Sequence, residues 1–289
     1  MPELPEVETT AALIRPHVEG RTVDGAEVDW VRTLGGASPD EFAAAVRGAT
    51  ISEVRRRAKW VVMDLERGGR PAGALLCHLR MTGRLVVDPW EEAPQPYQRV
   101  ELHLQRRGEP RSRLRFLDVR KFGRLRFAPE GAAALEPLGP EPLGPDFTLA
   151  RFARDLKARR RALKPLLLDQ GFVAGLGNIY VDESLFLAGL HPLRRSDRVP
   201  RDRVARLHAA IRSTLAAAIE REGSSFDAFY RTPEGQPGSY QHLFRVYGRD
   251  GQPCHDCGRT IKKFVVGQRG THVCTRCQPS PRPARASRP

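Results

Sequence analysis

The second residue of the chain has the most distinctive chemistry in the sequence. Pro2 follows Met1, and a small residue at this position predicts that Met1 is removed, which exposes a secondary amine beside Glu3 and Glu6. An N-terminal amine has a pKa near 8, against about 10.4 for a lysine side chain, so about a hundredfold more of it is neutral and nucleophilic at pH 7. With an aldehyde, a secondary amine forms an iminium ion that keeps its charge and withdraws electrons strongly. A proline that simply starts a helix is the alternative interpretation.

The five cysteines divide into two pairs and one single residue. Cys254 and Cys257 form one C-x2-C pair, and Cys274 and Cys277 form a second, with sixteen residues between the pairs. Two such turns on a hairpin supply the four thiolates of a closed tetrahedral shell, so the spacing predicts one structural zinc ion. Two disulfides are the alternative, but they require an oxidising compartment. Cys77 lies in an apolar run and is expected to be a small buried residue.

A glycine-rich turn precedes a helical pattern at residues 172–189. Gly175 and Gly177 allow the backbone to approach a ligand closely, and Asn178 is a good N-cap for the following helix. Free N–H groups at a helix start bind phosphate, so the segment is a candidate phosphate site. A tight turn without a ligand is the alternative.

An opening helix and a set of strands are expected to position the N-terminal groups. Pro5 and the early glutamates favour a helix that runs toward Gly20, and Pro16 is expected to bend it or end it early. Short runs of alternating or clustered apolar residues then predict the strands of a sandwich or barrel. These runs contain Trp60, Val61, Val62, Met63, Val100, Leu102, Leu104, Leu114, Phe116, Leu125 and Phe127.

The second half of the chain has a helical period. A segment rich in Pro and Gly at 135–147 predicts a linker, and one or two helices are expected over 149–169. A longer helix that Gly223 caps is predicted from apolar residues three and four apart. That helix contains Val204, Leu207, Ile211, Leu215 and Ile219. The polar stretch before Tyr247 is a candidate mobile loop, and the Arg- and Pro-containing tail after Cys277 is expected to be disordered.

Charge and composition narrow the class of protein further. The 289 residues contain 48 Lys and Arg against 34 Asp and Glu, which gives a net charge of +14 and predicts a polyanionic partner such as nucleic acid. A soluble basic protein without such a partner is the alternative. No apolar run reaches the ~18–20 residues of a membrane span, and the N-terminus lacks the pattern of a signal peptide. We therefore expect no membrane association and no export.

Seven segments, in this order, resemble bacterial formamidopyrimidine-DNA glycosylases. They are PELPEVET at the start, RRRAKW around Lys59, HLRMTG at 78–83, DVRKFG at 118–123, GLGNIYVDESLF, VYGR at 246–249 and the four-cysteine ribbon. The resemblance implies an α+β fold: an N-terminal β-sandwich flanked by helices, then a helix-two-turn-helix domain and a zinc-finger hairpin. The implied divisions are a catalytic domain at 1–134, a linker at 135–147, a helical domain at 148–245, the zinc hairpin at 246–278 and a basic tail at 279–289.

The resemblance also implies a catalytic set. Pro2 would attack C1′ of the damaged nucleotide and displace the base, and β- and δ-elimination from the resulting Schiff base would then cut the strand. Glu3 would act as general acid and base with support from Glu6, and Lys59 would lie near the lesion and contact its phosphate. Arg269 is placed in both the catalytic and the DNA-binding sets.

A second implied set contacts DNA. Met81, Arg120 and Phe122 match the three residues that fill the space left by a flipped nucleotide, and Asn178 and Arg269 match phosphate contacts. His78 and Tyr247, in two of the shared motifs, complete the set. A loop at 226–243 has the position of the segment that covers the flipped base, but its sequence GQPGSYQHL is not a close match. DVRKFG also departs from the commoner DPRRFG while keeping Arg and Phe.

The function that the resemblance implies is removal of oxidised purines, such as 8-oxoguanine and formamidopyrimidines, with lyase activity. The alternatives are the related endonuclease VIII branch, which acts on oxidised pyrimidines, and a noncatalytic zinc-ribbon DNA-binding protein. PELPEV instead of PEGPEI favours the purine branch. We expect one structural Zn²⁺, no redox or nucleotide cofactor, damaged double-stranded DNA as partner, a monomer, and a cytoplasmic, nucleoid-associated location.

Overall fold

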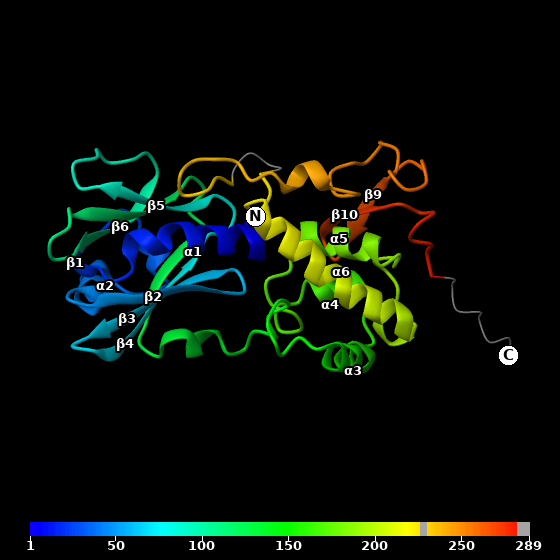
Figure 1. The fold of residues 1–289 in the computed structure, drawn as a ribbon, viewed down its shortest axis with the longest axis horizontal. Coiled ribbons are helices and arrows are strands. Elements are labelled where there is room, and N and C mark those ends of the chain that lie inside the picture. The colour runs from blue at the N-terminus through cyan, green and yellow to red at the C-terminus, as the bar shows by residue number, and fades with distance from the viewer. Residues whose placement is uncertain (226–229, 282–289) are drawn as a thin grey trace. The chain divides into compact units, whose positions relative to one another are not determined.

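The computed structural model of the chain describes residues 1–225 and 230–281. It forms two compact units, Met1–Pro137 with Ala218–Gln241, and Leu138–Ala217 with His242–Pro289 (Figure 1). The sequence prediction assigned 148–245 to one helical domain, whereas Ala218–Gln241 groups with the first unit. The reason lies in hydrogen bonds from Ser224 and Tyr230 to Glu6.

The first helix, α1 (Leu4–Val18), begins where the sequence predicted. Pro5 occupies the first turn, and the backbone N–H of Glu3 donates to Oε2 of Glu6 in the manner of a capping box. The helix continues through Pro16 to Val18, so the expectation that Pro16 ends it early is wrong. Pro16 removes the hydrogen bond to the carbonyl of Ala12, but Ala12 is exposed and water can satisfy that carbonyl.

The first unit contains one antiparallel sheet of eight strands in the order β5-β7-β6-β1-β2-β3-β4-β8. β1 and β2 share one registered pair, Thr22↔Thr50, so the sheet is narrow there and its two halves form the layers of the expected sandwich. The strands are β1 (Thr22–Val28), β2 (Thr50–Arg57), β3 (Trp60–Arg67), β4 (Arg70–His78), β5 (Gly83–Pro89), β6 (Gln98–Gln105), β7 (Ser112–Asp118) and β8 (Arg124–Ala128). The short helices are η1 (Val31–Leu34), α2 (Pro39–Val46) and η2 (Gly131–Leu135).

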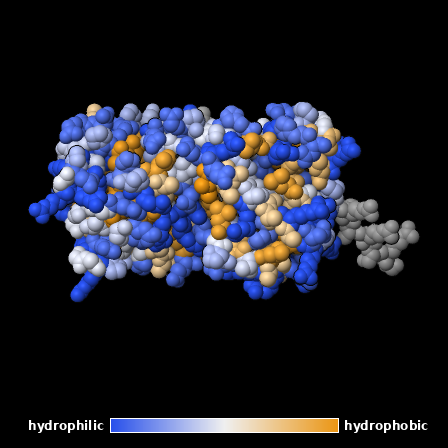
Figure 2. Space-filling model, viewed as in Figure 1, coloured by the Kyte–Doolittle hydropathy of each residue, from blue (hydrophilic) through white to orange (hydrophobic). Residues whose placement is uncertain are grey.

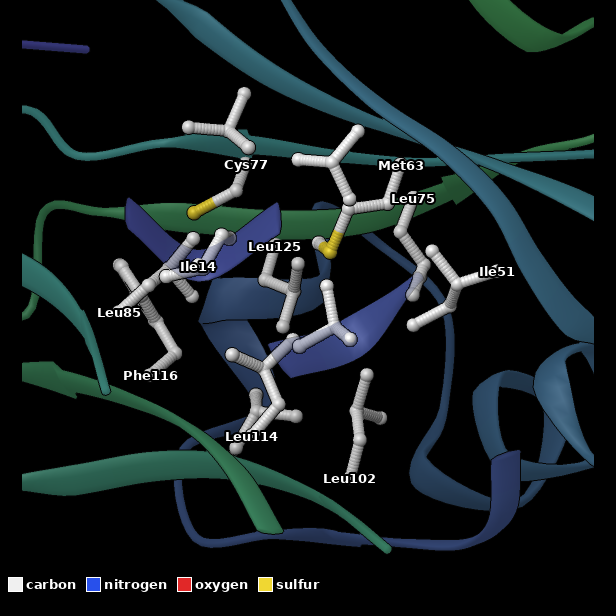
Figure 3. Packing of buried hydrophobic residues seen from close by; sticks show 14 of the residues in the cluster. Ile14, Ile51, Met63, Leu75, Cys77, Leu85, Leu102, Leu114, Phe116 and Leu125 are labelled. Atoms are coloured by element: carbon white, nitrogen blue, oxygen red, sulfur yellow. The ribbon is translucent and has the colours of Figure 1, made fainter. Parts of the chain in front are cut away.

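The core of this unit takes side chains from α1, α2 and all eight strands. Helix α1 packs against β2 and β3 of one half and β5 of the other. In Figure 3, Ile14 of α1 lies among Cys77 of β4 and Phe116 of β7. Cys77 is fully buried as expected, and burial raises the pKa of its thiol far above the ordinary value.

The second unit is helical and ends in a hairpin. Two helices are present over 149–169, where one or two were expected, and the long helix reaches Glu220, with Gly223 just beyond at a φ of +78°. The helices are α3 (Leu149–Arg159), α4 (Leu163–Leu167), α5 (Asn178–Leu187), η3 (Ser196–Arg198), α6 (Arg201–Glu220), whose last residues belong to the first unit, and η4 (Tyr240–Leu243). The hairpin strands are β9 (Lys262–Val266) and β10 (Arg269–Val273).

Hydrophilic side chains cover most of the face seen in Figure 2, and the hydrophobic residues on it form small separate patches. Among the described helices, none has the length and apolar character needed to cross a bilayer. Residues 282–289 of the tail, and residues 226–229 of the loop predicted to cover the base, lie outside the described residues.

Candidate active site and DNA-contact residues

Pro2, Glu3 and Glu6 lie together at the start of α1, as the sequence predicted. All three are buried, and the carboxyl-bearing residues are 3% (Glu3) and 2% (Glu6) exposed. One oxygen of Glu6 accepts the N–H of Glu3 at 2.8 Å, which fixes the backbone next to Pro2. A carboxylate held in this way limits how far the N-terminal residues can move.

The second oxygen of Glu6 binds a segment far away in the sequence. Oε1 accepts the backbone N–H of Ser224 at 2.8 Å and its hydroxyl at 3.3 Å. A Cβ on Gly223 would lie 2.7 Å from Cγ and Oε1 of Glu6, so glycine is required there. The Tyr230 hydroxyl donates to the Glu6 carbonyl at 3.2 Å, and burial, with the Glu6 charge, raises the pKa of this phenol. Glu6 thus joins the N-terminus to the residues on both sides of 226–229.

Lys59 and His78 lie at neighbouring positions of the sheet, one in the turn before β3 and the other at the end of β4. Lys59 directly precedes β3, and its neighbour Trp60 pairs with His78 at the end of β4. Both side chains are buried, at 6% exposed for Lys59 and 8% for His78. Burial, assisted by the charges of Arg80 and Lys59, lowers the pKa of His78 to about 3. The imidazole is therefore neutral, and its Nδ1 accepts the Arg80 N–H at 3.0 Å.

Met81, Arg120 and Phe122 are brought together by two loops, at 79–82 and 119–123. Nη1 of Arg120 is 3.1 Å from the sulfur of Met81, and its guanidinium lies 4.9 Å from the centre of the Phe122 ring. Phe122 is 49% exposed, so the set is on the surface and not in the core. The Phe122 ring is therefore available for contact with a partner molecule.

The buried carboxylate of Asp118 accepts hydrogen bonds from both of these loops. It is 1% exposed, accepts the Thr82 hydroxyl, and accepts the backbone N–H groups of Arg120 at 3.2 Å and Gly123 at 2.7 Å. A Cβ on Gly123 would collide with the Phe116 ring. One buried carboxylate therefore sets the positions of Met81, Arg120 and Phe122.

The four paired cysteines form a single cluster in the second unit. Their sulfur atoms all lie within 4.8 Å of one another, with 3.9 Å between Cys254 and Cys277 and 3.4 Å between Cys257 and Cys274. A tetrahedral zinc ion with Zn–S bonds of about 2.3 Å requires sulfurs about 3.8 Å apart, so the cluster fits zinc. No other ligand position remains, and the site is structural.

The zinc hairpin also places the expected phosphate residues. Gly267 and Gln268 form the turn, both with positive φ, and Arg269 follows as an exposed residue at the start of β10. Nδ2 of Asn178 donates to the carbonyl of Gly270 at 2.9 Å. The N-cap of α5 is Gly177, so the prediction that Asn178 caps this helix is wrong, because the Asn178 side chain bonds to the hairpin instead.

A buried ion pair supports the same carbonyl. The ammonium of Lys164 lies 2.7 Å from Asp182 and 2.9 Å from the Gly270 carbonyl, and both charged side chains are at most 1% exposed. Asp182 also accepts the backbone N–H of His272 at 2.9 Å. The backbone beside Arg269 is therefore held from two sides.

Comparison with known proteins identifies the family. Family models match the formamidopyrimidine-DNA glycosylase N-terminal domain at residues 1–125, the H2TH domain of the same enzyme at 138–229, and the zinc finger found in FPG and IleRS at 251–279. The formamidopyrimidine-DNA glycosylase of Chloroflexus aggregans is 46% identical, and that of Chloroflexus aurantiacus 43%; each alignment covers 96% of this chain and 98% of the relative. The chain belongs to the formamidopyrimidine-DNA glycosylase family.

Solved glycosylases of this family have the same fold. The crystal structure of MutM (Fpg) from Thermus thermophilus superposes with a TM-score of 0.83 at 41% identity, and covers 96% of this chain and 98% of that one. Lactococcus lactis Fpg, in complex with a FAPY-dG-containing DNA, gives 0.84 at 31% identity, over 96% and 100%. The α+β fold with a four-cysteine zinc finger is confirmed.

Two of the predicted DNA-contact residues of this glycosylase lie below the surface layer. His78 packs edge-on against Trp60, with ring centres 4.8 Å apart, and holds the Arg80 N–H. Tyr247 is half-buried between Phe244 and His272, and its N–H donates to Glu183. In this structure both residues form hydrogen bonds within the protein, His78 with the Arg80 N–H and Tyr247 with Glu183.

Sequence reasoning missed Asp118, Ser224 and Tyr230. Asp118 stands at the head of the DVRKFG segment, and this place in a shared motif was the available signal. Ser224 and Tyr230 act through a residue more than two hundred positions away, and the sequence around them contains no pattern that indicates it.

Proposed function

We propose that this chain removes oxidised purines from double-stranded DNA and then cleaves the strand at the abasic site. It is an enzyme of base-excision repair, a DNA glycosylase with associated lyase activity. The observation that carries the assignment of its nucleophile is the buried cluster of Pro2, Glu3 and Glu6 at the head of α1. A polyanionic substrate agrees with the net charge of +14.

The first chemical step is attack by the Pro2 nitrogen once Met1 is removed. A bond forms from this nitrogen to C1′, and the bond from C1′ to the base breaks, with its electron pair leaving on the base, which takes up the proton that the nitrogen loses. The Glu3 carboxyl supplies the proton that the ring oxygen needs when the sugar opens, which leaves an iminium ion on Pro2. Glu6 acts as a positioning residue, because it binds the N–H of Glu3.

The positive charge of the iminium ion makes elimination possible, because this charge acidifies the C2′ proton. Removal of that proton expels the 3′ phosphate, and a second elimination then expels the 5′ phosphate. Lys59 is buried near the neutral His78, in the same unit as Pro2, and its proposed role is to contact the phosphate of the lesion. Arg269 and Asn178 bind further phosphates from the second unit.

Access to C1′ requires the nucleotide to leave the base stack, which costs a few kcal/mol unless the hole is filled. Met81 and Phe122 are apolar and sized for this space, and the Arg120 guanidinium between them can donate to the orphaned base. Their exposure on two loops fixed by Asp118 supports this role.

The four thiolates of Cys254, Cys257, Cys274 and Cys277 hold zinc, which crosslinks the hairpin and supplies no reaction chemistry. By crosslinking the hairpin, zinc fixes the position of Arg269. A single chain carries every residue named above, so we propose that the enzyme acts as a monomer.

Borohydride trapping tests the proposal. On a duplex with one 8-oxoguanine opposite C, reduction is expected to join the enzyme covalently to DNA through Pro2, whereas a duplex with undamaged G gives no adduct.

Pro2→Gly keeps an α-amine but makes it primary, so lyase turnover should fall while DNA affinity is retained. Unchanged turnover, or Met1 still attached in fully active enzyme by mass spectrometry, would refute the role of Pro2. Faster cleavage of thymine glycol than of 8-oxoguanine would favour the pyrimidine branch.

We further propose that the enzyme works in the cytoplasm, on the nucleoid. The basis is the DNA-repair family and its bacterial relatives. Cell fractionation with and without nuclease treatment tests this: the enzyme should be released from the nucleoid fraction when DNA is digested.

A further inference from the structure

Lys121 has a strained backbone conformation in the loop at 119–123, between Arg120 and Phe122. It is exposed, and its φ is +61°, in the left-handed region that residues with a Cβ rarely adopt. Strained residues of this kind persist where the surrounding structure holds them, and they gather at functional sites. The contacts of Lys121 therefore indicate what keeps this loop in its conformation.

Hydrogen bonds hold the loop on both sides of Lys121 but not at its centre. The Asp118 carboxylate accepts the backbone N–H of Arg120 at 3.2 Å and that of Gly123 at 2.7 Å. The N–H groups of Lys121 and Phe122, which lie between these two, form no hydrogen bond with a residue that the structure describes. The centre of the loop thus depends on side-chain contacts.

The side chain of Lys121 makes such a contact with Trp30. Its ammonium lies 4.1 Å from the centre of the indole ring, inside the range of about 6 Å for a cation–π interaction. Arg32 lies farther from the same ring, at 5.8 Å. None of the described carboxylates forms an ion pair with Lys121. The Trp30 ring is therefore the contact that the structure shows for this charge.

Trp30 is itself held by the backbone around it. It is the N-cap of η1, its N–H donates to the Arg99 carbonyl at 3.3 Å, and its carbonyl accepts the Thr33 N–H at 3.0 Å. Helix η1 packs against β8, the strand that directly follows the loop.

The polar group of the indole does not explain the presence of a tryptophan here. The ring is half-buried, and its Nε1 is buried without a hydrogen-bond partner among the described residues, although a buried indole N–H usually has one. What Trp30 contributes is therefore its apolar packing and the face of its ring.

We propose that Trp30 is a positioning residue for the loop at 119–123, because its ring holds Lys121 at the centre of that loop. This inference rests on the role proposed above for Met81, Arg120 and Phe122. The guanidinium of Arg120 lies 4.9 Å from the centre of the Phe122 ring, so the residues on the two sides of Lys121 contact each other. A loop that already has this arrangement loses less conformational freedom when it enters the base stack.

Single-turnover excision of 8-oxoguanine from a duplex, with saturating enzyme, tests this role. Trp30→Leu keeps an apolar side chain and removes the aromatic face. It is expected to lower the rate constant about two- to fivefold, which corresponds to the loss of an exposed cation–π interaction. Trp30→Phe retains an aromatic face, so its rate constant should be closer to that of the wild type than to that of Trp30→Leu.

A second reaction separates positioning of the loop from an effect on the chemistry. Cleavage at an abasic site in single-stranded DNA uses the same Pro2 amine, but a single strand has no paired stack in which a space must be filled. Trp30→Leu should therefore leave the rate of this cleavage unchanged. An equal reduction of both reactions would overturn the proposal.

Trp90 offers a matched control in the same unit. It is also half-buried, and the guanidinium of Arg111 lies 3.9 Å from the centre of its ring. Trp90 follows Pro89, whereas Gly83, at the other end of β5, pairs with Asp118 beside the loop. The seven residues of β5 span about 20 Å. Trp90→Leu thus removes a comparable contact far from the loop and should leave both rates unchanged.

A double-mutant cycle tests whether the contact between the two side chains carries the effect. Lys121→Met removes the charge and leaves the packing of Trp30 intact, and it is expected to lower excision by the same factor as Trp30→Leu. This prediction can be tested even if Trp30→Leu folds poorly, which thermal unfolding detects. The double variant should be no slower than either single variant.

Losses that multiply in the double variant would overturn the proposal, as would a rate constant for Trp30→Leu within about 1.5-fold of the wild type. Slow excision by Lys121→Met together with normal excision by Trp30→Leu would also overturn it, because Lys121 would then act on DNA directly. A wild-type enzyme that does not excise 8-oxoguanine would refute the function proposed above. Normal wild-type excision with no effect of Trp30→Leu would refute only the role of Trp30.

Discussion

Because His78 is neutral in the folded enzyme, it should make the free energy of unfolding fall at acid pH, and the substitution His78→Asn should remove this effect. In the folded enzyme the pKa of His78 is about 3, whereas an unfolded histidine has a pKa of about 6.5. Between these values the unfolded chain binds a proton that the folded chain does not. The stability that His78 contributes is therefore complete above the unfolded pKa and is lost as the pH falls toward 3.

Between pH 7.5 and pH 4.5, the change in the free energy of unfolding that His78 causes depends only on its pKa in the unfolded chain. Between pH 7.5 and pH 4.5 the unfolded histidine titrates through about two pH units, and the folded one remains neutral as long as its pKa is below about 4. The free energy of unfolding should then fall by about 3 kcal/mol because of this group. Solvent screens this histidine little, because its side chain is 8% exposed.

Urea unfolding of wild type and His78→Asn at pH 7.5 and 4.5 measures this quantity. The asparagine oxygen can accept the Arg80 N–H in place of Nδ1, so the variant keeps the hydrogen bond and loses the titration. Zinc release and other acid effects are common to both proteins and cancel in the difference. Equal losses of stability in the two proteins, or an NMR titration of His78 near pH 6.5, would refute the reasoning.

Three further perturbations test other parts of the structure. Cys277→Ser should release zinc, measured as metal per protein, and weaken DNA binding, whereas Cys77→Ala should retain zinc; retained metal in the serine variant would contradict the four-thiolate site. Asp118→Ala leaves the Gly123 N–H unpaired and the Arg120 N–H with the Thr82 hydroxyl alone, and should lower the free energy of unfolding by about 1–3 kcal/mol in urea; a change below about 0.5 kcal/mol would show that other groups hold the loops. Arg269→Ala should reduce the slope of log affinity against log salt concentration by about 0.9, and an unaltered slope would remove this residue from the phosphate contacts.

The features predicted best from the sequence depend on local spacing. The C-x2-C pairs fix four ligands wherever the hairpin lies, and the alternation of apolar residues around Leu102 and Leu114 follows from the pleat, which directs alternate side chains of a strand to the hydrophobic core. Strand β2 was not predicted, because TISEVRRR has two fully buried residues in eight and its charged side chains conceal the alternation. The helix ending at Glu220 was predicted because its apolar residues, from Val204 to Ile219, repeat over about four turns.

The features that sequence could not provide depend on contacts made by the fold. Glu6 and Ser224 are 218 residues apart, and only the folded sheet and α6 bring them together. The neutrality of His78 requires burial beside Lys59, which adjacent strands create. Asn178 is a residue type that often caps helices, but its side chain donates to the Gly270 carbonyl instead. In each case a long-range partner overrides the local preference.

The placement of the cysteines has a consequence for an enzyme whose substrates are products of oxidation. Four of the five thiols are committed to metal, and the fifth, Cys77, is sealed in the core with its thiolate form suppressed. Peroxide therefore meets no free reactive thiol among the five cysteines, and oxidation of the paired cysteines must begin with loss of the zinc ion. Damage through the thiols should therefore follow zinc release and not precede it.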